Sequence, residues 1–116
     1  MVKLIMLGLD GCSPDQIYRH ADELPNFNRV MNAGTHGINR SVVPPITPHA
    51  WTTIFLGNNP GMFGYRDFNY RKNYAYTEDA SVTSMTCKEP RLHNILPQYD
   101  LKMGLAGILF SSATLS

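Results

Sequence analysis

The chain has few cysteines and few charges, and each shortage excludes a class of protein. Its 116 residues include only two cysteines, Cys12 and Cys87, which are too few for a disulfide framework. Charged residues make up 16%, and ten basic against nine acidic side chains leave a net charge of +1. This balance excludes a strongly basic nucleic-acid module, whose affinity would depend on many cations that neutralise phosphates.

The sequence also lacks a long hydrophobic run. The longest one, residues 103–110, has the length of a strand and contains two glycines, whereas a membrane helix needs about 20 apolar residues. The apolar start of the chain is interrupted by Asp10, and no cleavage site of small residues follows it. We therefore expect a cytoplasmic protein, with neither a membrane nor a nucleic acid among its partners.

Apolar segments alternate with helical patterns along the chain. Residues 2–9 and 101–110 are nearly continuous apolar runs, which is typical of strands buried on both faces of a parallel sheet. Helices are expected at residues 15–23, 24–33, 47–56 and 90–96. Residues 57–90 are expected to form a long loop, which contains a short hairpin near residues 74–83. This order predicts an α/β fold, a parallel sheet with flanking helices, as a single partial domain over residues 1–116.

Asp10 follows the first expected strand, at the edge where open α/β sheets bind ligands. Gly8 and Gly11 flank it and allow the backbone to approach a ligand closely. The segment lacks the G-x-G-x-x-G pattern of dinucleotide-binding loops, and Gly8 stands where a haloacid-dehalogenase-type phosphatase needs its nucleophilic aspartate. Two interpretations remain: Asp10 is a ligand for a divalent cation, or it only caps the turn.

Thr47 begins the most informative segment. We expect it at the N-cap of the helix 47–56, with Pro48 at the first helical position. Its hydroxyl would lie beside free N–H groups and the positive end of the helix dipole, where phosphate binds. A bound metal or an adjacent base would make such a hydroxyl a nucleophile. The alternative is that Thr47 only caps the helix, and His49 is either a proton donor or a polar residue of the first turn.

The two segments together resemble the type I phosphodiesterase/nucleotide pyrophosphatase family of the alkaline phosphatase superfamily, and more narrowly its predicted phosphohydrolase/phosphomutase branch. The similarity covers about the first 70 residues, and its segments are residues 7–11, 24–27, 33–35, 41–53 and 57–68. The resemblance implies that the chain is the N-terminal part of an alkaline-phosphatase-like core.

The resemblance also implies roles for individual residues. Asp10 matches the first metal-binding aspartate of the family, and Thr47 matches the nucleophilic threonine, which binds the same metal. The family uses two divalent cations, commonly zinc, with manganese as the alternative. The implied activity is a metal-dependent phosphoryl-transfer hydrolase that cleaves a small phosphodiester or phosphomonoester through a phosphothreonine intermediate.

Three departures from the family pattern qualify this expectation. Phe68 stands where nucleotide pyrophosphatases have an asparagine, and Phe63 stands where most members have a histidine. The other metal ligands of the family would lie beyond Ser116. We therefore expect an N-terminal fragment that needs a missing C-terminal part or a self-association partner. The alternative is a non-catalytic phosphate- or partner-binding fragment that lacks the metal site.

Overall fold

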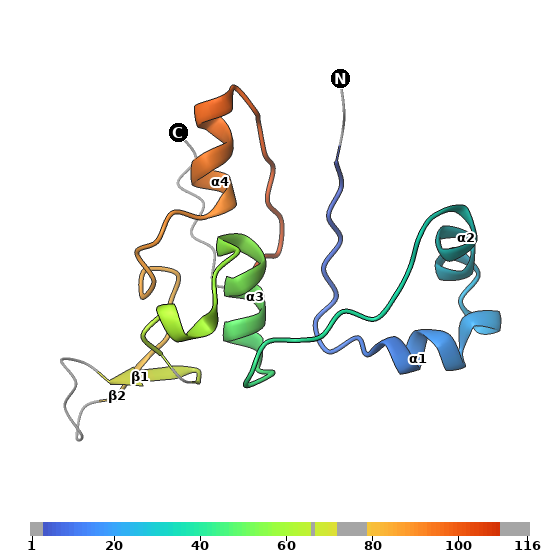
Figure 1. Ribbon diagram of the computed structural model, residues 1–116, viewed down its shortest axis with the longest axis horizontal. Helices are drawn as coiled ribbons and strands as arrows, with labels where there is room; N and C mark the ends of the chain where they lie inside the picture. Colours follow the sequence, from blue (N-terminus) through green and yellow to red (C-terminus); the bar gives the residue numbers. More distant parts are fainter. Residues whose placement is uncertain (1–3, 66, 72–78, 110–116) are drawn as a thin grey trace. The chain divides into compact units, whose positions relative to one another are not determined.

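The computed structural model describes residues 4–65, 67–71 and 79–109 (Figure 1). The chain divides into two compact units, Met1–Arg40 and Ser41–Ser116, and each unit is described by itself. No helix in these described ranges is long and apolar enough to cross a membrane.

The first unit contains three short helical elements. They are the α-helices α1 (Pro14–Arg19) and α2 (Pro25–Ala33) and the 3-10 helix η1 (Ala21–Glu23). A proline begins both α-helices, because the fixed φ of proline suits the first turn and its missing N–H is not needed there. The Tyr18 hydroxyl and His36 Nδ1 are 3.2 Å apart, which joins the segment after α2 to α1.

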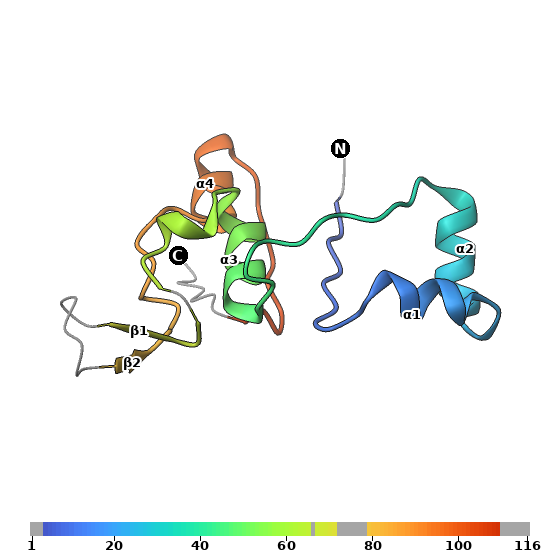
Figure 2. The same cartoon turned by 60° about the horizontal axis from the view of Figure 1, so that its bottom comes forward.

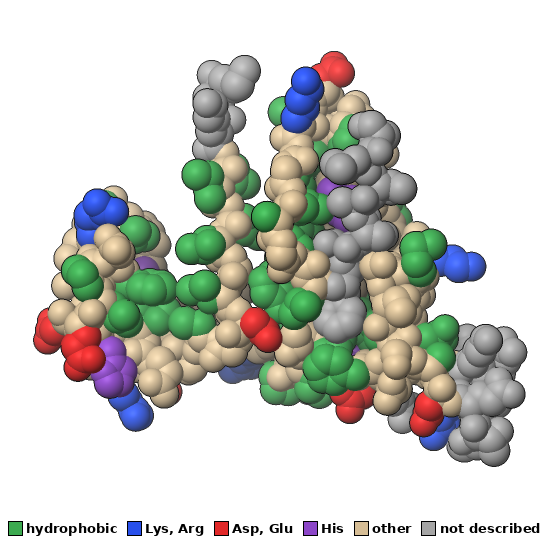
Figure 3. Space-filling model, turned by 180° about the vertical axis from the view of Figure 1, so that it is seen from behind, with side chains coloured by type: hydrophobic (Ala, Val, Ile, Leu, Met, Phe, Trp, Pro, Cys, Tyr) green, Lys and Arg blue, Asp and Glu red, His purple; other side chains and the backbone are tan. Residues whose placement is uncertain are grey.

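The expected buried strand at residues 2–9 is not formed over its described residues, 4–9. This segment is irregular, and its apolar side chains are exposed, with Leu4 at 83% and Ile5 at 91% (Figure 3). The second expected strand is likewise irregular over residues 101–109. An apolar run becomes a buried strand only when neighbouring strands and helices cover it. The parallel sheet predicted from these two runs is therefore absent from the described residues.

The second unit combines helices with a small antiparallel sheet. Its elements are α3 (Thr47–Leu56), η2 (Pro60–Met62), β1 (Asn69–Arg71), β2 (Asp79–Ser81), α4 (Leu92–Ile95) and η4 (Leu96–Tyr99). Strands β1 and β2 are antiparallel, with Tyr70 opposite Ala80. The hairpin expected near residues 74–83 thus includes β2, and its residues 74–78 lie outside the described part of the chain. Helix α4 contacts α3 (Figure 2).

A small core holds this second unit together. Four buried side chains form it, and they are Phe63, Tyr65, Val82 and Cys87. Leu56, near the end of α3, and Tyr70 of β1 pack against this cluster. The core therefore joins α3, the segment that follows it, and the two-stranded sheet. It fixes the position of α3, the helix that begins at Thr47.

Candidate functional site

Thr47 is the first residue of α3, and the N-cap is Ile46. The Ile46 carbonyl accepts the backbone N–H of Ala50 at 3.0 Å, so Ile46 supplies the acceptor of the first helical hydrogen bond. The expectation that Thr47 is the N-cap was therefore wrong by one residue. The helix itself has the predicted bounds, 47–56.

The N-terminus of α3 is chemically suited to an anionic group. The first backbone N–H groups of a helix have no intrahelical acceptor, and Pro48 contributes none. The N–H groups of Thr47 and His49 therefore lie at the positive end of a helix of ten residues. A phosphoryl group at this end would be next to the half-buried Thr47 side chain.

His49 is a buried core residue rather than a free proton donor. Its side chain is 2% exposed, and its Nε2 donates to the backbone carbonyl of Tyr65 at 2.8 Å. The imidazole stacks on the Tyr65 ring, with centroids 5.3 Å apart, and on the Phe63 ring at 6.5 Å. These contacts use Nε2 and the ring to hold the chain after α3, while Nδ1 is buried and has no hydrogen-bond partner among the described residues.

Tyr65 makes a second connection to α3 through its side chain. Its hydroxyl donates a 2.6 Å hydrogen bond to Thr52 Oγ1. Burial raises the pKa of the Tyr65 hydroxyl above 10.0, and Cys87 adds to this effect, while the bond to Thr52 and the charge of Arg91 oppose it. Tyr65 thus fixes α3 at His49 and at Thr52, within the first two turns after Thr47.

The buried face of α3 differs from the face expected from hydrophobicity alone. Hydrophobicity alone favours burial of Trp51, Ile54 and Phe55, whereas the buried residues are Pro48, His49, Thr52 and Phe55. Ile54 is half exposed. Positions 48, 52 and 55 do have helical spacing, but Thr52 and His49 are polar. Their burial depends on partners in Tyr65, which lies well beyond the end of the helix.

Asp10 lies in the first unit, at the turn formed by residues 10 and 11. Gly11 has a φ of +67°, a conformation that glycine adopts without steric cost. The Asp10 side chain is exposed. Because Asp10 belongs to the first unit and Thr47 to the second, their meeting at one metal ion stays a prediction.

The described residues do not complete a metal centre. Among residues 4–65, 67–71 and 79–109, no three His, Cys, Asp or Glu side chains are grouped to hold an ion. The oxygens of Asp10 and Thr47 are the kind of ligand that divalent cations prefer. A catalytic zinc ion generally has three protein ligands, so these two residues supply only part of such a site.

The sequence matches the family described as type I phosphodiesterase / nucleotide pyrophosphatase over residues 4–98. The chain belongs to this family. The matched region includes Asp10, Thr47 and all the elements from α1 to α4, and so it extends the resemblance beyond the first 70 residues. Comparisons with curated proteins and with solved structures gave no match. Phosphodiesterases and pyrophosphatases are hydrolases, and members of this family generally use divalent metal ions.

Proposed function

We propose that this chain contributes to the active site of a metal-dependent phosphoryl-transfer hydrolase, with Thr47 as the nucleophile and Asp10 as a metal ligand. The observation that carries this proposal is the family match, because it spans both residues. The position of Thr47 at the start of α3 supports it. The substrate class is a small phosphate ester, either a diester or a monoester.

The Thr47 hydroxyl would act in two steps. In the first step Oγ1 forms a bond to phosphorus, its proton is released, and the leaving-group oxygen departs with the electron pair of the broken P–O bond. In the second step the oxygen of a water molecule bonds to phosphorus, the bond from phosphorus to Oγ1 breaks, Oγ1 takes up a proton, and the phosphate product leaves. The N–H groups of Thr47 and His49 would donate to the phosphoryl oxygens, where negative charge accumulates in the transition state.

Asp10 and Thr47 would each donate one oxygen to the same ion, zinc or manganese, of a two-metal site. When bound, such ions lower the pKa of the attacking hydroxyl and neutralise charge on the phosphoryl oxygens. We propose that the remaining ligands come from further polypeptide beyond residue 116 or from a second copy of the chain. In the same assembly, residues 4–9 would pair as a strand of the parallel sheet of an alkaline-phosphatase-like core.

The chemistry of the two cysteines supports a cytoplasmic location. Cys12 and Cys87 are both free thiols, and Cys12 is exposed. An exposed free thiol suits a reducing compartment, so we propose that the protein acts in the cytoplasm.

The first experiment counts metal ions and then measures turnover. The protein, in the form that contains all the proposed metal ligands, is equilibrated with zinc or manganese, analysed for bound metal, and assayed with a chromogenic phosphodiester and a phosphomonoester. Thr47→Ala should abolish turnover and the phosphothreonine seen by mass spectrometry, while it largely keeps metal binding. Thr53→Ala, in the same helix but two turns away, is the matched control and should retain turnover. Near-normal turnover by Thr47→Ala would refute the nucleophile.

The Asp10 role is tested separately, by metal affinity. Asp10→Ala should weaken binding of one of the two ions, and equal affinity for both ions would exclude Asp10 as a ligand. The non-catalytic alternative predicts a different set of results. In that case phosphate binding survives a chelator, and Thr47→Ala leaves it nearly intact, because the backbone N–H groups of α3 would carry it.

A further inference from the structure

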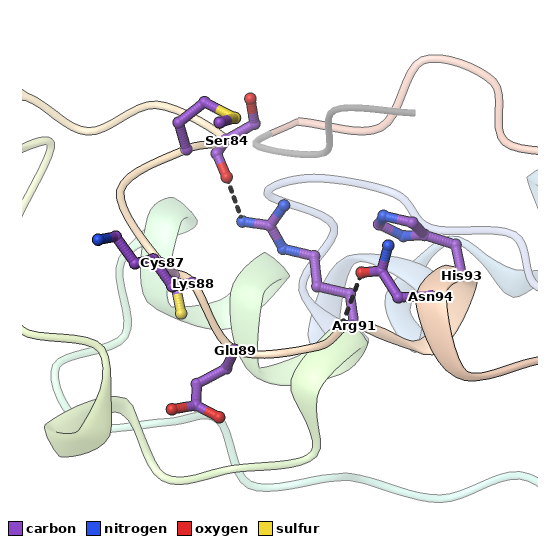
Figure 4. A pocket seen from close by; sticks show the side chains of 8 residues that line it. Ser84, Cys87, Lys88, Glu89, Arg91, His93 and Asn94 are labelled. Atoms are coloured by element: carbon purple, nitrogen blue, oxygen red, sulfur yellow. Dashed lines mark hydrogen bonds between the residues drawn. The ribbon is translucent and has the colours of Figure 1, made fainter. Parts of the chain in front are cut away.

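The second unit contains a cavity that the proposed active site does not use. Its volume is about 280 Å³, and residues of the segment 84–94 line it (Figure 4). Neither Asp10 nor Thr47 is among the lining residues. The cavity lies within one unit of the chain, so its shape does not depend on how the two units are arranged.

Arg91 is the buried charge in this cavity. Arg91 is only 6% exposed, and its Nη2 atom donates a hydrogen bond to the Ser84 carbonyl at 2.7 Å. A guanidinium has five N–H donors, and no ion pair joins this one to a carboxylate in the described part of the chain. Burying a cation without a counter-ion costs free energy, and an anion in the cavity would offset that cost.

The side chains beside Arg91 do not supply the negative charge that such an anion would bring. Glu89 and Lys88 also line the cavity, and both are exposed. Figure 4 shows the Glu89 carboxylate turned away from the Arg91 guanidinium. The Asn94 Oδ1 atom accepts the backbone N–H of Arg91 at 3.0 Å, which holds the start of α4 against the cavity.

The charge of Arg91 also reaches the core. It lowers the pKa of Tyr65, against the larger raising effect of burial. Tyr65 and Cys87 belong to the core cluster, and Cys87 lines the cavity as well. Because Arg91 is also 6% exposed, its guanidinium is poorly solvated, and a charge-assisted hydrogen bond is stronger there than on an open surface.

We infer that this cavity binds a small oxyanion, a phosphate or a carboxylate group, through the N–H donors of Arg91 that the Ser84 carbonyl does not use. The planar fork of a guanidinium matches two oxygens of either group. The volume is ample for an anion of that size. This inference is independent of the proposed function, because it involves neither Thr47 nor a metal ion.

The test is a titration of the isotope-labelled full chain with inorganic phosphate, in the presence of a chelator that removes metal ions. The NMR signal of the Arg91 side-chain Nε–H should shift and saturate at millimolar phosphate. Arg91→Met should weaken binding about tenfold or more, the scale expected for losing a hydrogen-bonded charge. Glu89→Gln should strengthen it by a factor of about two, because it removes a nearby negative charge.

A control variant tests whether the effect is specific to Arg91. Arg29→Met, which replaces an exposed arginine of α2, should bind phosphate like the parent chain. If Arg91→Met does not fold, Arg91→Lys keeps the charge but loses the fork, and it should still bind more weakly than the parent. Acetate and sulfate titrations show whether carboxylate or phosphate-like anions are preferred.

Three outcomes would overturn the inference. The first is a signal that does not saturate, the second is equal affinity in the parent chain and both Arg91 variants, and the third is an equal loss of binding in Arg29→Met. The second result would place the anion elsewhere, for example at the backbone N–H groups of α3. None of these outcomes depends on a metal ion or on the Thr47 hydroxyl, so this inference and the proposed function are tested independently.

Discussion

Tyr65 joins α3 to the chain that follows it through two of its groups. Its carbonyl accepts the Nε2 hydrogen of His49, and its hydroxyl donates to Thr52. Both contacts are buried, so removing one partner leaves a polar atom without water or a substitute. At the scale of single residues, these bonds hold the helix that begins at Thr47.

Replacing Tyr65 by phenylalanine tests the hydroxyl alone. Tyr65→Phe keeps the ring stacked on His49 but removes the donor to Thr52, so we expect a loss of about 1–2 kcal/mol in the free energy of unfolding. Urea denaturation measures this loss. Tyr99→Phe, at a residue that is 71% exposed, should change little. In the double variant Tyr65→Phe with Thr52→Val, the losses should be less than additive, and full additivity would contradict the bond.

The pKa of Tyr65 predicts a loss of stability in alkaline solution. Since burial raises this pKa above 10.0 in the folded chain, the folded state holds the proton more tightly than the unfolded state does. The contribution is fully present below pH 10.0 and is lost as the pH rises from there through the raised pKa. Urea midpoints at increasing pH should therefore fall more steeply above pH 10 for the parent chain than for Tyr65→Phe. Parallel curves would rule out the shift.

At the scale of elements, α3 ends where its sequence predicts. Gly57 has a φ of +68° and donates its N–H to the Thr53 carbonyl at 2.8 Å. A glycine in the left-handed conformation is a common helix terminator, because it has no Cβ to clash with the backbone. The turn it makes directs the chain into η2 and toward Phe63 and Tyr65.

Gly57→Ala should therefore destabilise the second unit through the backbone alone. A Cβ at residue 57 meets no atom within 4 Å, so the cost is that of the left-handed conformation, about 1–2 kcal/mol. The free energy of unfolding of the variant measures it. Gly104→Ala is the matched control, because residue 104 has equal space and no positive φ, and it should have little effect. Equal stability of the two variants would contradict this account.

The strands expected from apolar runs did not form in the described residues, whereas the helices expected from local sequence patterns did. Helices were expected to begin at residues 15 and 24, and α1 and α2 begin within one residue of these positions, each at a proline. Such signals are local, since they depend on one residue's φ and N–H. Residues 4–9 and 101–109 have strand-like composition and are not strands. A strand requires a hydrogen-bonded neighbour, which its own residues cannot supply.

At the scale of the whole molecule, the chain changes units between Arg40 and Ser41. Arg40 is exposed and lies outside any helix or strand, which is the kind of site where proteases cut first. Limited trypsin digestion followed by mass spectrometry should therefore show cleavage after Arg40 before cleavage after Arg29, which lies within α2. Lys102, exposed and irregular, serves as the reference for an accessible site. Cleavage after Arg29 at the same rate would contradict the boundary.

The candidate site could be predicted from the sequence only in part. Thr47 and Asp10 stand in recognisable local patterns, a Thr-Pro helix start and an Asp-Gly turn, and the family match includes both. Arg91 and Tyr65 carry no such pattern. Their roles come from a cavity, a carbonyl at residue 84 and a hydroxyl at residue 52, all of them made by separate segments of the chain.

The sequence by itself determined the family, the bounds of α3 and the position of Thr47 next to the helix start. Each of these depends on residues adjacent in the chain, through proline and glycine backbone preferences and ordered motifs. Only the tertiary structure decided which face of α3 is buried. That face carries His49 and Thr52, and burying them is favourable only because the chain returns after Gly57 and brings both partners on Tyr65 to them.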